Sequence, residues 1–120
     1  MRVYLSGGMK SGWQNIVKEK CPNLYFIDPS KHELSSPSQY TLWDLEGVKH
    51  CDIVFAYMEL DNPSGIGLSL EIGYAKALGK TVILVDAKMD ARMQIVRETA
   101  DIVFPKLEYG IDFLKSFERM

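Results

Sequence analysis

The sequence predicts an α/β fold in which helices cover both faces of a mostly parallel, five-stranded sheet. Short runs rich in β-branched and aromatic residues alternate with stretches of helical periodicity along almost the whole chain. Such alternation is typical of parallel strands joined by crossover helices. The 120 residues suffice for one domain with a substantial core, and no repeat, linker or low-complexity segment divides them. We therefore expect residues 1–120 to form a single three-layer sandwich of the Rossmann or flavodoxin type.

The start of the chain is expected to supply two strands and one helix. Residues 2–6 form a short β-rich run that opens into Gly7 and Gly8, as expected where a strand gives way to a loop. A short helix is expected at residues 12–20, and it leads to a second buried strand at residues 24–28.

A polar segment rich in proline and serine occupies residues 29–38. It is long for a simple connection, and loops of this kind often carry function. The next helix is expected at residues 40–50, where Leu42, Leu45 and Val48 recur at helical spacing and are predicted to face the core.

The remainder of the chain continues the alternation. The sequence predicts a third strand at residues 52–57, a small-residue loop at 62–67, a helix from residue 68, a fourth strand at 81–85, a short helix at 91–99, a fifth strand at 101–104 and a closing helix at 109–117.

In open parallel sheets, ligands bind beyond the carboxyl ends of the strands. Four loops are expected to meet at that edge, at residues 6–12, 29–37, 58–67 and 87–93. The helix that leaves the third of these loops carries a single acid near its start, Glu71, which would be presented to a ligand at the same edge.

Glu71 lies on the apolar face of its predicted helix. It comes three residues after Leu68 and four before Ala75, and the apolar positions recur at Leu68, Ile72, Ala75 and Leu78. A carboxylate on an inward face is costly unless it has a partner, and such groups concentrate at functional sites. The alternative is an acid at the edge of the core with a purely structural partner.

Other polar residues and glycines at this edge admit two interpretations each. Gly7, Gly8, Gly65 and Gly67 allow a ligand to approach the backbone or merely turn the chain, and they match neither a dinucleotide fingerprint nor a phosphate-binding P-loop.

Tyr4, near the end of the first strand, is either a ligand-facing hydroxyl or a core tyrosine. Asp44 begins a helical turn and Asp28 ends the second strand, so each is either functional or an ordinary helix-terminal or strand-terminal acid.

Composition excludes several classes of partner. The net charge is −2 and the basic residues never form a run, so no nucleic-acid polymer is expected to bind. No apolar stretch approaches the length of about 20 residues that a membrane span needs. The chain enters a strand at once and leaves no room for a signal peptide, which makes the cytoplasm the expected location.

The cysteines and histidines give no metal pattern. Cys21 and Cys51 lie in different segments and are expected to be reduced thiols. His50 and Asp52 flank Cys51 without a second pair of ligands, so we expect neither a metal nor another cofactor. His32 lies in the polar loop and is expected to be solvated.

Three segments together carry a family resemblance. They are VYLSGG at residues 3–8, DLEGVKHCDIVF at 44–55 and GIGLSLEIGYA at 65–75. Their order, spacing and strand–loop–helix contexts resemble those of the nucleoside 2-deoxyribosyltransferase family, which includes the related 2′-deoxynucleoside 5′-phosphate N-hydrolases. The resemblance extends from residue 2 to about residue 104.

The resemblance implies an enzyme that cleaves the N-glycosidic bond of (deoxy)ribonucleosides and transfers the sugar to another base. Glu71 would attack C1′ and form a glycosyl-enzyme, as in a retaining glycosidase. Tyr4 would hydrogen-bond the carboxylate, and Asp44 would bind the nucleobase and protonate it as it leaves. Met93 falls where the family places a residue near a neighbouring subunit's site. The substrate-binding candidates are Ser6, Gly7, Gly8, Asp28, Ser64, Gly65, Gly67 and Met93.

Two alternatives remain open at this point. One is an N-glycosidase that hydrolyses (deoxy)nucleoside 5′-monophosphates. Relatives of that kind bind phosphate with serines, where this chain has Gly8 and Gly65, and this difference favours nucleosides. Other residues could still meet a phosphate, namely Ser64, Lys10, Ser11 and Arg92. The second alternative is a non-catalytic nucleotide-binding module, against which stands the presence of Tyr4, Asp44 and Glu71.

The family resemblance also implies assembly. Relatives form dimers or larger assemblies, so we expect at least a homodimer, with the C-terminal helix or the helix that carries Asp44 in the contact. The expected small-molecule partners are a nucleoside or nucleotide and a free nucleobase.

Overall fold

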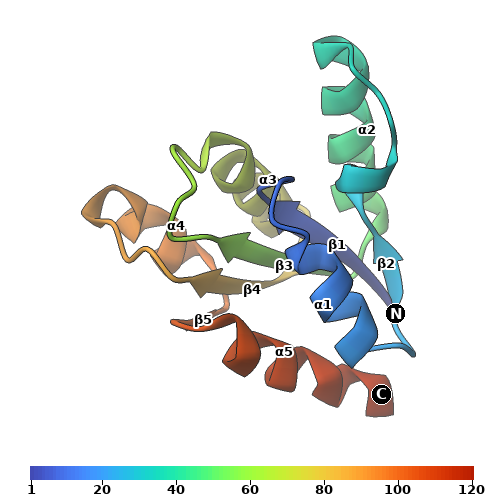
Figure 1. The fold of residues 1–120 in the computed structure, drawn as a ribbon, viewed down its shortest axis with the longest axis vertical. Helices are drawn as coiled ribbons and strands as arrows, with labels where there is room; N and C mark the ends of the chain where they lie inside the picture. The colour runs from blue at the N-terminus through green and yellow to red at the C-terminus, as the bar shows by residue number, and fades with distance from the viewer.

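The computed structural model describes residues 1–120 and contains one sheet of five strands in the order β2-β1-β3-β4-β5 (Figure 1). Every neighbouring pair is parallel, so the sheet is wholly rather than mostly parallel. The strands are β1 (Arg2–Gly7), β2 (Tyr25–Ile27), β3 (Ile53–Met58), β4 (Thr81–Asp86) and β5 (Ile102–Phe104).

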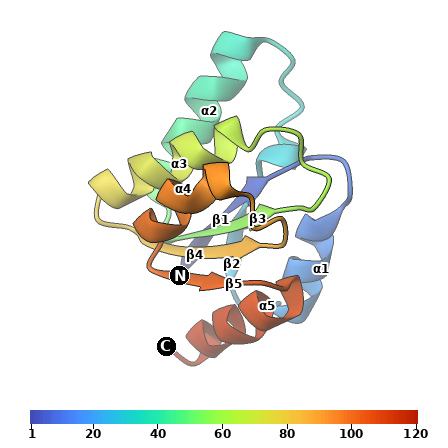
Figure 2. The same cartoon turned by 90° about the vertical axis from the view of Figure 1, so that its left-hand side faces the viewer.

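Five α-helices cover the sheet in two layers (Figure 2). Helices α2, α3 and α4 lie on one face, and α1 and α5 lie on the other, which gives the predicted three-layer sandwich. The helices are α1 (Trp13–Lys20), α2 (Pro37–His50), α3 (Ile66–Ala77), α4 (Gln94–Thr99) and α5 (Leu107–Lys115), and short 3₁₀ helices occupy Pro29–Lys31, Ala91–Met93 and Ser116–Arg119.

The period-two alternation of the strands divides the core into two clusters. Side chains of even-numbered residues in β1, β3 and β4 face α2, α3 and α4, and those of odd-numbered residues in β1, β3, β4 face α1 and α5. The free thiols Cys21 and Cys51 are buried in different clusters. None of the helices combines the length and the apolar character that a membrane span requires.

Helix boundaries differ from the prediction mainly around the polar loop. Asp28 caps the 3₁₀ helix at Pro29–Lys31, and α2 already begins at Pro37, because a proline fits the first position of a helix. The predicted inward direction of two leucines is wrong: Leu42 is 62% exposed, and Leu78 is 41% exposed at the end of α3.

Helix α2 stands out from the rest of the molecule, and its amino-terminal half extends beyond the sheet (Figure 1). Its carboxyl-terminal half packs on β1 because Gly47 has no side chain. A Cβ at this position would lie 2.9 Å from a ring carbon of Tyr4 and 3.0 Å from Ile27 Cγ2. Gly47 therefore sets how closely α2 approaches the Tyr4 ring.

Strand order also fixes where a ligand can bind. From β1 the chain builds β2 on one side and β3 on the other, so the direction of sheet growth reverses between β1 and β3. Loops that follow these two strands diverge and leave a crevice at their carboxyl ends.

Candidate active site

Glu71 lies at this crevice, on α3, and both of its carboxyl oxygens are bound by hydroxyl groups of β1. The Tyr4 hydroxyl donates to Oε2 at 2.7 Å, and the Ser6 hydroxyl donates to Oε1 at 2.6 Å. Tyr4 and Ser6 are fully buried and Glu71 is 9% exposed. The inward direction predicted for Glu71 and the Tyr4 contact are therefore present, and the partner of the acid is a pair of neutral donors.

The alternation of β1 explains why these two hydroxyls act together. Tyr4 and Ser6 are two residues apart and lie on the same face of the sheet, whereas Val3 and Leu5 face the opposite core. In the register with β3, Ser6 lies beside Ala56, whose small side chain limits crowding at the carboxylate.

Burial is the main influence on the pKa of Glu71. Its removal from water raises the pKa of the carboxyl to about 6, although the hydrogen bonds from Ser6 and Tyr4 lower it, and Asp44 raises it further. Burial and the neighbouring Glu71 charge raise the pKa of Tyr4 well above its usual value, so its phenol stays protonated and remains a donor. No lysine or arginine forms an ion pair with Glu71.

The charge of Asp44 raises the pKa of Glu71, but the two carboxyls have different environments. It occupies the interior of α2 rather than the start of a helical turn, so the interpretation as a helix-terminal acid is wrong. Its Oδ1 is buried without a hydrogen-bond partner, and the nearest cationic candidate is His32 Nε2 at 3.5 Å. Burial raises the pKa of Asp44, and His32 opposes that shift.

The prediction that His32 is solvated is wrong. Its side chain is only 12% exposed and packs edge-on against Trp43, with ring centroids 5.0 Å apart. Tyr40 stacks parallel to it with centroids 6.4 Å apart. Sequence reasoning missed His32 because an isolated histidine in a polar loop has no periodic pattern to indicate burial.

The glycine loops bring backbone close to the crevice. At Gly7, which has φ +152°, a Cβ would lie 2.5 Å from the carbonyl oxygen of Tyr57, so no side chain fits. Gly65 has a left-handed conformation (φ 68°) and precedes the first residue of α3, and a Cβ there would lie 2.9 Å from Met58 Sδ. Gly67, by contrast, lies inside α3 with open space beside it.

Two cavities flank the carboxyl edge, and Glu71 lines neither of them. One of about 670 Å³ is polar and lined by Gly8, Met9, Lys10, Ser11, Glu59, Asp61, Asn62 and Pro63. The other, of about 610 Å³, is lined by Met58, Pro63, Ser64, Ile66, Ser69, Leu70, Asp90, Arg92 and Met93. Glu71 itself is 9% exposed, and both of its carboxyl oxygens are occupied by hydroxyl donors.

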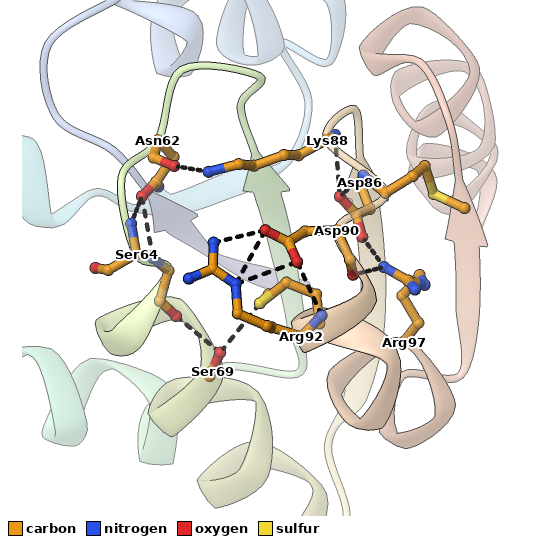
Figure 3. Close-up of polar contacts among 11 residues, drawn as sticks. Asn62, Ser64, Ser69, Asp86, Lys88, Asp90, Arg92 and Arg97 are labelled. Atoms are coloured by element: carbon orange, nitrogen blue, oxygen red, sulfur yellow. Dashed lines mark hydrogen bonds and ion pairs between the residues drawn. The ribbon is translucent and has the colours of Figure 1, made fainter.

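Polar contacts tie together the loops around the second cavity (Figure 3). Asn62 Oδ1 accepts hydrogen bonds from the backbone N–H groups of Ser64 and Gly65, at 3.2 and 3.1 Å. Lys88 Nζ donates to the carbonyl oxygen of Asn62 at 2.6 Å and so joins the loop after β3 to the loop after β4. Arg92 donates to Asp90, with the closest contact at 2.7 Å.

The fully buried Asp86 anchors the second of these loops. Its carboxylate pairs with Arg97 at 2.8 Å and accepts from the backbone N–H groups of Lys88 and Met89. A charged pair and two backbone hydrogen bonds thus fix this turn, and all the partners of the Asp86 carboxylate are structural.

Two sequence-predicted binding residues, Asp28 and Met93, make contacts that do not involve Glu71. Asp28 pairs with Lys18 at 2.5 Å and accepts from Ser30; burial alone would raise its pKa, but these partners lower it overall. Met93 is 5% exposed and packs beside the start of α3, with its sulfur 3.8 Å from Ser69 Oγ. No group of three or more metal-ligating side chains occurs in the chain.

Fold and geometry together define an α/β protein of the flavodoxin strand order whose crevice holds a buried, hydroxyl-bound glutamate. No family model and no curated protein matches the sequence. Solved structures share its fold. A 2-deoxyribosyltransferase from Bacillus psychrosaccharolyticus is 19% identical with a TM-score of 0.71, and the match covers 96% of this chain and 90% of the other.

Two further structures extend the comparison. The 2-desoxiribosyltransferase from Leishmania mexicana is 16% identical with a TM-score of 0.71, covering 96% of this chain and 97% of the other. A CMP N-glycosidase from Clostridium botulinum is 22% identical with a TM-score of 0.67, covering 97% and 99%. The structural neighbours therefore have the fold that the sequence resemblance predicted, over nearly the whole chain.

Proposed function

We propose that this protein cleaves the N-glycosidic bond of nucleosides, with Glu71 as the nucleophile, and transfers the sugar to another base. The observation that carries this proposal is the environment of Glu71: a buried carboxylate whose two oxygens are held by Tyr4 and Ser6 and which no cation neutralises. Such a group keeps its negative charge available for an electron-deficient carbon. The structures of two deoxyribosyltransferases with the same fold support the choice of reaction.

The first half-reaction is a displacement at C1′. A carboxylate oxygen of Glu71 forms a bond to C1′ while the bond from C1′ to the base nitrogen breaks, and its electron pair leaves with the base. Asp44 donates a proton to the departing base, a role favoured by the raised pKa of its carboxyl. The product is a glycosyl ester of Glu71 and a free nucleobase.

The second half-reaction restores the enzyme. A nitrogen of an acceptor base attacks C1′, the ester bond breaks, and its electrons return to the Glu71 carboxylate. Asp44, now a carboxylate, accepts the proton that the incoming base loses. Water in place of the base would give hydrolysis by the same route.

A nucleoside 5′-monophosphate is the second candidate substrate, and the fold shared with the CMP N-glycosidase favours it. The charges at the two cavities favour an unphosphorylated nucleoside. Ser11 already donates to Glu59 at 2.9 Å, and the Arg92 guanidinium already donates to Asp90. Both acids would place negative charge beside a bound phosphate and compete with it for these donors.

Incubation of deoxyadenosine with free cytosine tests the proposal, and formation of deoxycytidine is the expected result. A parallel incubation with deoxyribonucleoside monophosphates tests the second candidate through release of the sugar phosphate. Intact-protein mass spectrometry without an acceptor base should detect a deoxyribosyl adduct on the wild type and none on Glu71→Ala. Absence of base release from every nucleoside and nucleotide would leave the non-catalytic binding module as the function.

The proposed enzyme is at least a homodimer with α2 in the contact. The part of α2 that extends beyond the sheet exposes Leu42 by 62% and Tyr40 by 37%, and such exposed apolar groups are typical of interfaces. Light scattering should give at least twice the mass of one chain for the wild type and a lower mass for Leu42→Glu. A monomeric wild type at working concentration would contradict the assembly but not the chemistry.

A further inference from the structure

The polar loop before α2 places a histidine against Asp44. His32 Nε2 lies 3.5 Å from Asp44 Oδ1, which is slightly too long for a hydrogen bond. Oδ1 is the one buried side-chain polar atom of the chain that has no hydrogen-bond partner. A buried carboxylate oxygen without a donor is costly, so a small approach of the two side chains is favourable.

The loop backbone determines which nitrogen of His32 carries the proton. The backbone N–H of Leu34 donates to His32 Nδ1 at 2.9 Å, so this nitrogen is the acceptor of a neutral imidazole. The proton of the neutral ring is therefore on Nε2, the nitrogen that faces Asp44. Glu33, between these two residues, has φ 61°, a conformation that non-glycine residues rarely adopt and that the surrounding contacts must stabilise.

Aromatic packing fixes the direction of the imidazole. Trp43 contacts the His32 ring edge-on, and Tyr40 lies parallel to it. Both aromatic residues belong to α2, the helix that carries Asp44, so the loop and the helix hold the histidine and the acid in one unit. The charge of Asp44 in turn raises the pKa values of Tyr4 and Glu71.

We propose that His32 is a positioning residue for Asp44: its Nε2–H binds Oδ1 and so directs the other oxygen of Asp44 toward the leaving base. The Asp44 side chain accepts no hydrogen bond within the chain, and only its Oδ1 is a buried, unpartnered atom, so Oδ2 is left for proton transfer. Hydrogen bonds of this kind are often long without substrate and shorten when it binds. This inference rests on the proposed function and assigns a role to the polar loop.

The test compares two substrates that differ in their need for a proton. Deoxyadenosine needs protonation of its base on departure, whereas the base of 7-methyl-2′-deoxyguanosine is already cationic and leaves without it. His32→Phe keeps a ring against the aromatic side chains of α2 but removes the Nε2–H donor. With deoxyadenosine this variant should therefore lower kcat by about tenfold or more. His32→Gln, which retains a donor, should recover part of the loss. With the cationic substrate all variants should be within a few fold of the wild type.

A double variant distinguishes positioning from direct contact with the substrate. If His32 acts only through Asp44, then adding His32→Phe to Asp44→Asn should cause no further loss with deoxyadenosine. The matched control is Ser35→Ala in the same loop, an exposed side chain without hydrogen bonds, which should leave kcat unchanged.

Several results would overturn the proposal. They are unchanged kcat in His32→Phe, equal losses with both substrates, or multiplying losses in the double variant. Nitrogen-15 NMR of the wild-type imidazole gives an independent answer: a protonated Nε2 supports the proposal and a protonated Nδ1 overturns it, even if His32→Phe does not fold. Failure of the wild type to cleave either substrate would refute the proposed function itself, and so the two failures are distinguishable.

Discussion

Two buried carboxylates at the same edge of the sheet, Glu71 and Asp86, have contrasting partners. Asp86 is fully buried, pairs with the Arg97 guanidinium and accepts two backbone hydrogen bonds. Glu71 is 9% exposed and has only two hydroxyl donors. A cation neutralises a buried acid and makes it an anchor, whereas neutral donors hold the acid in place and leave its charge available for reaction. On this contrast we expect Asp86 to be a structural acid and propose Glu71 as the functional one.

The largest effect is expected at Glu71. Substitution by alanine should reduce base exchange by about 10⁴-fold or more, since removal of a covalent nucleophile is among the most damaging changes in an enzyme. Steady-state assays with deoxyadenosine and cytosine measure this loss. Asp86→Asn, which changes the other buried acid at this edge, serves as the matched control, and an equal loss there would erase the distinction between the two carboxylates.

Asp86→Ala should affect stability rather than chemistry. The Arg97 side chain is 17% exposed and would lose its carboxylate, which costs about 3 kcal/mol of unfolding free energy. Urea denaturation followed by circular dichroism measures this change, and the protein that remains folded should retain its kcat. A variant as stable as the wild type but inactive would place Asp86 in the chemistry.

Tyr4→Phe removes one of the two donors that favour the ionised form of Glu71. Loss of a hydrogen bond to a charged group should lower kcat by about tenfold to a hundredfold. Because the Tyr4 contact lowers the pKa of Glu71, the acid limb of the pH–rate profile should also move upward from about 6. The pH profile is the decisive measurement, and an unshifted limb would show that Tyr4 does not act on the carboxylate.

The smallest effect is a dependence of stability on pH. The pKa of Glu71 is about 6 in the fold and 4.5 ordinarily, so between these values the folded state binds more protons than the unfolded state. Stability should therefore rise as the pH falls from 6 to 4.5, by about 2 kcal/mol from this one group. In Glu71→Gln this contribution is absent, and the difference between the two proteins cancels the other titrating groups. A constant difference across this range would mean that burial does not raise the pKa.

Much of the fold follows from patterns that the sequence displays. The strands were predictable because they are short runs rich in β-branched and aromatic residues, and the helices because apolar residues recur every three to four positions. The inward direction of Glu71 was predictable because it interrupts an apolar helical face. The start of α2 at Pro37 was not, since the proline-rich approach gives the same signal for a loop and for a first helical turn.

The environment of Asp44 could not be predicted from such patterns. Its unpartnered oxygen and the nearby His32 depend on the way a loop folds back onto a helix, which is a tertiary contact without periodicity. The role of Gly47 is hidden for the same reason, because only the packed structure shows that the Tyr4 ring occupies the space of its missing side chain.

The spacing of the two hydroxyls on β1 has a practical consequence for folding studies. If β1 paired with β3 one residue out of register, Val3 and Leu5 would face Glu71 in place of Tyr4 and Ser6. Such a misassembled chain could have nearly normal secondary structure and yet contain a carboxylate surrounded by hydrocarbon. Recovery of the proposed base exchange after dilution from denaturant would therefore monitor correct alignment of the central strands, which circular dichroism alone does not distinguish.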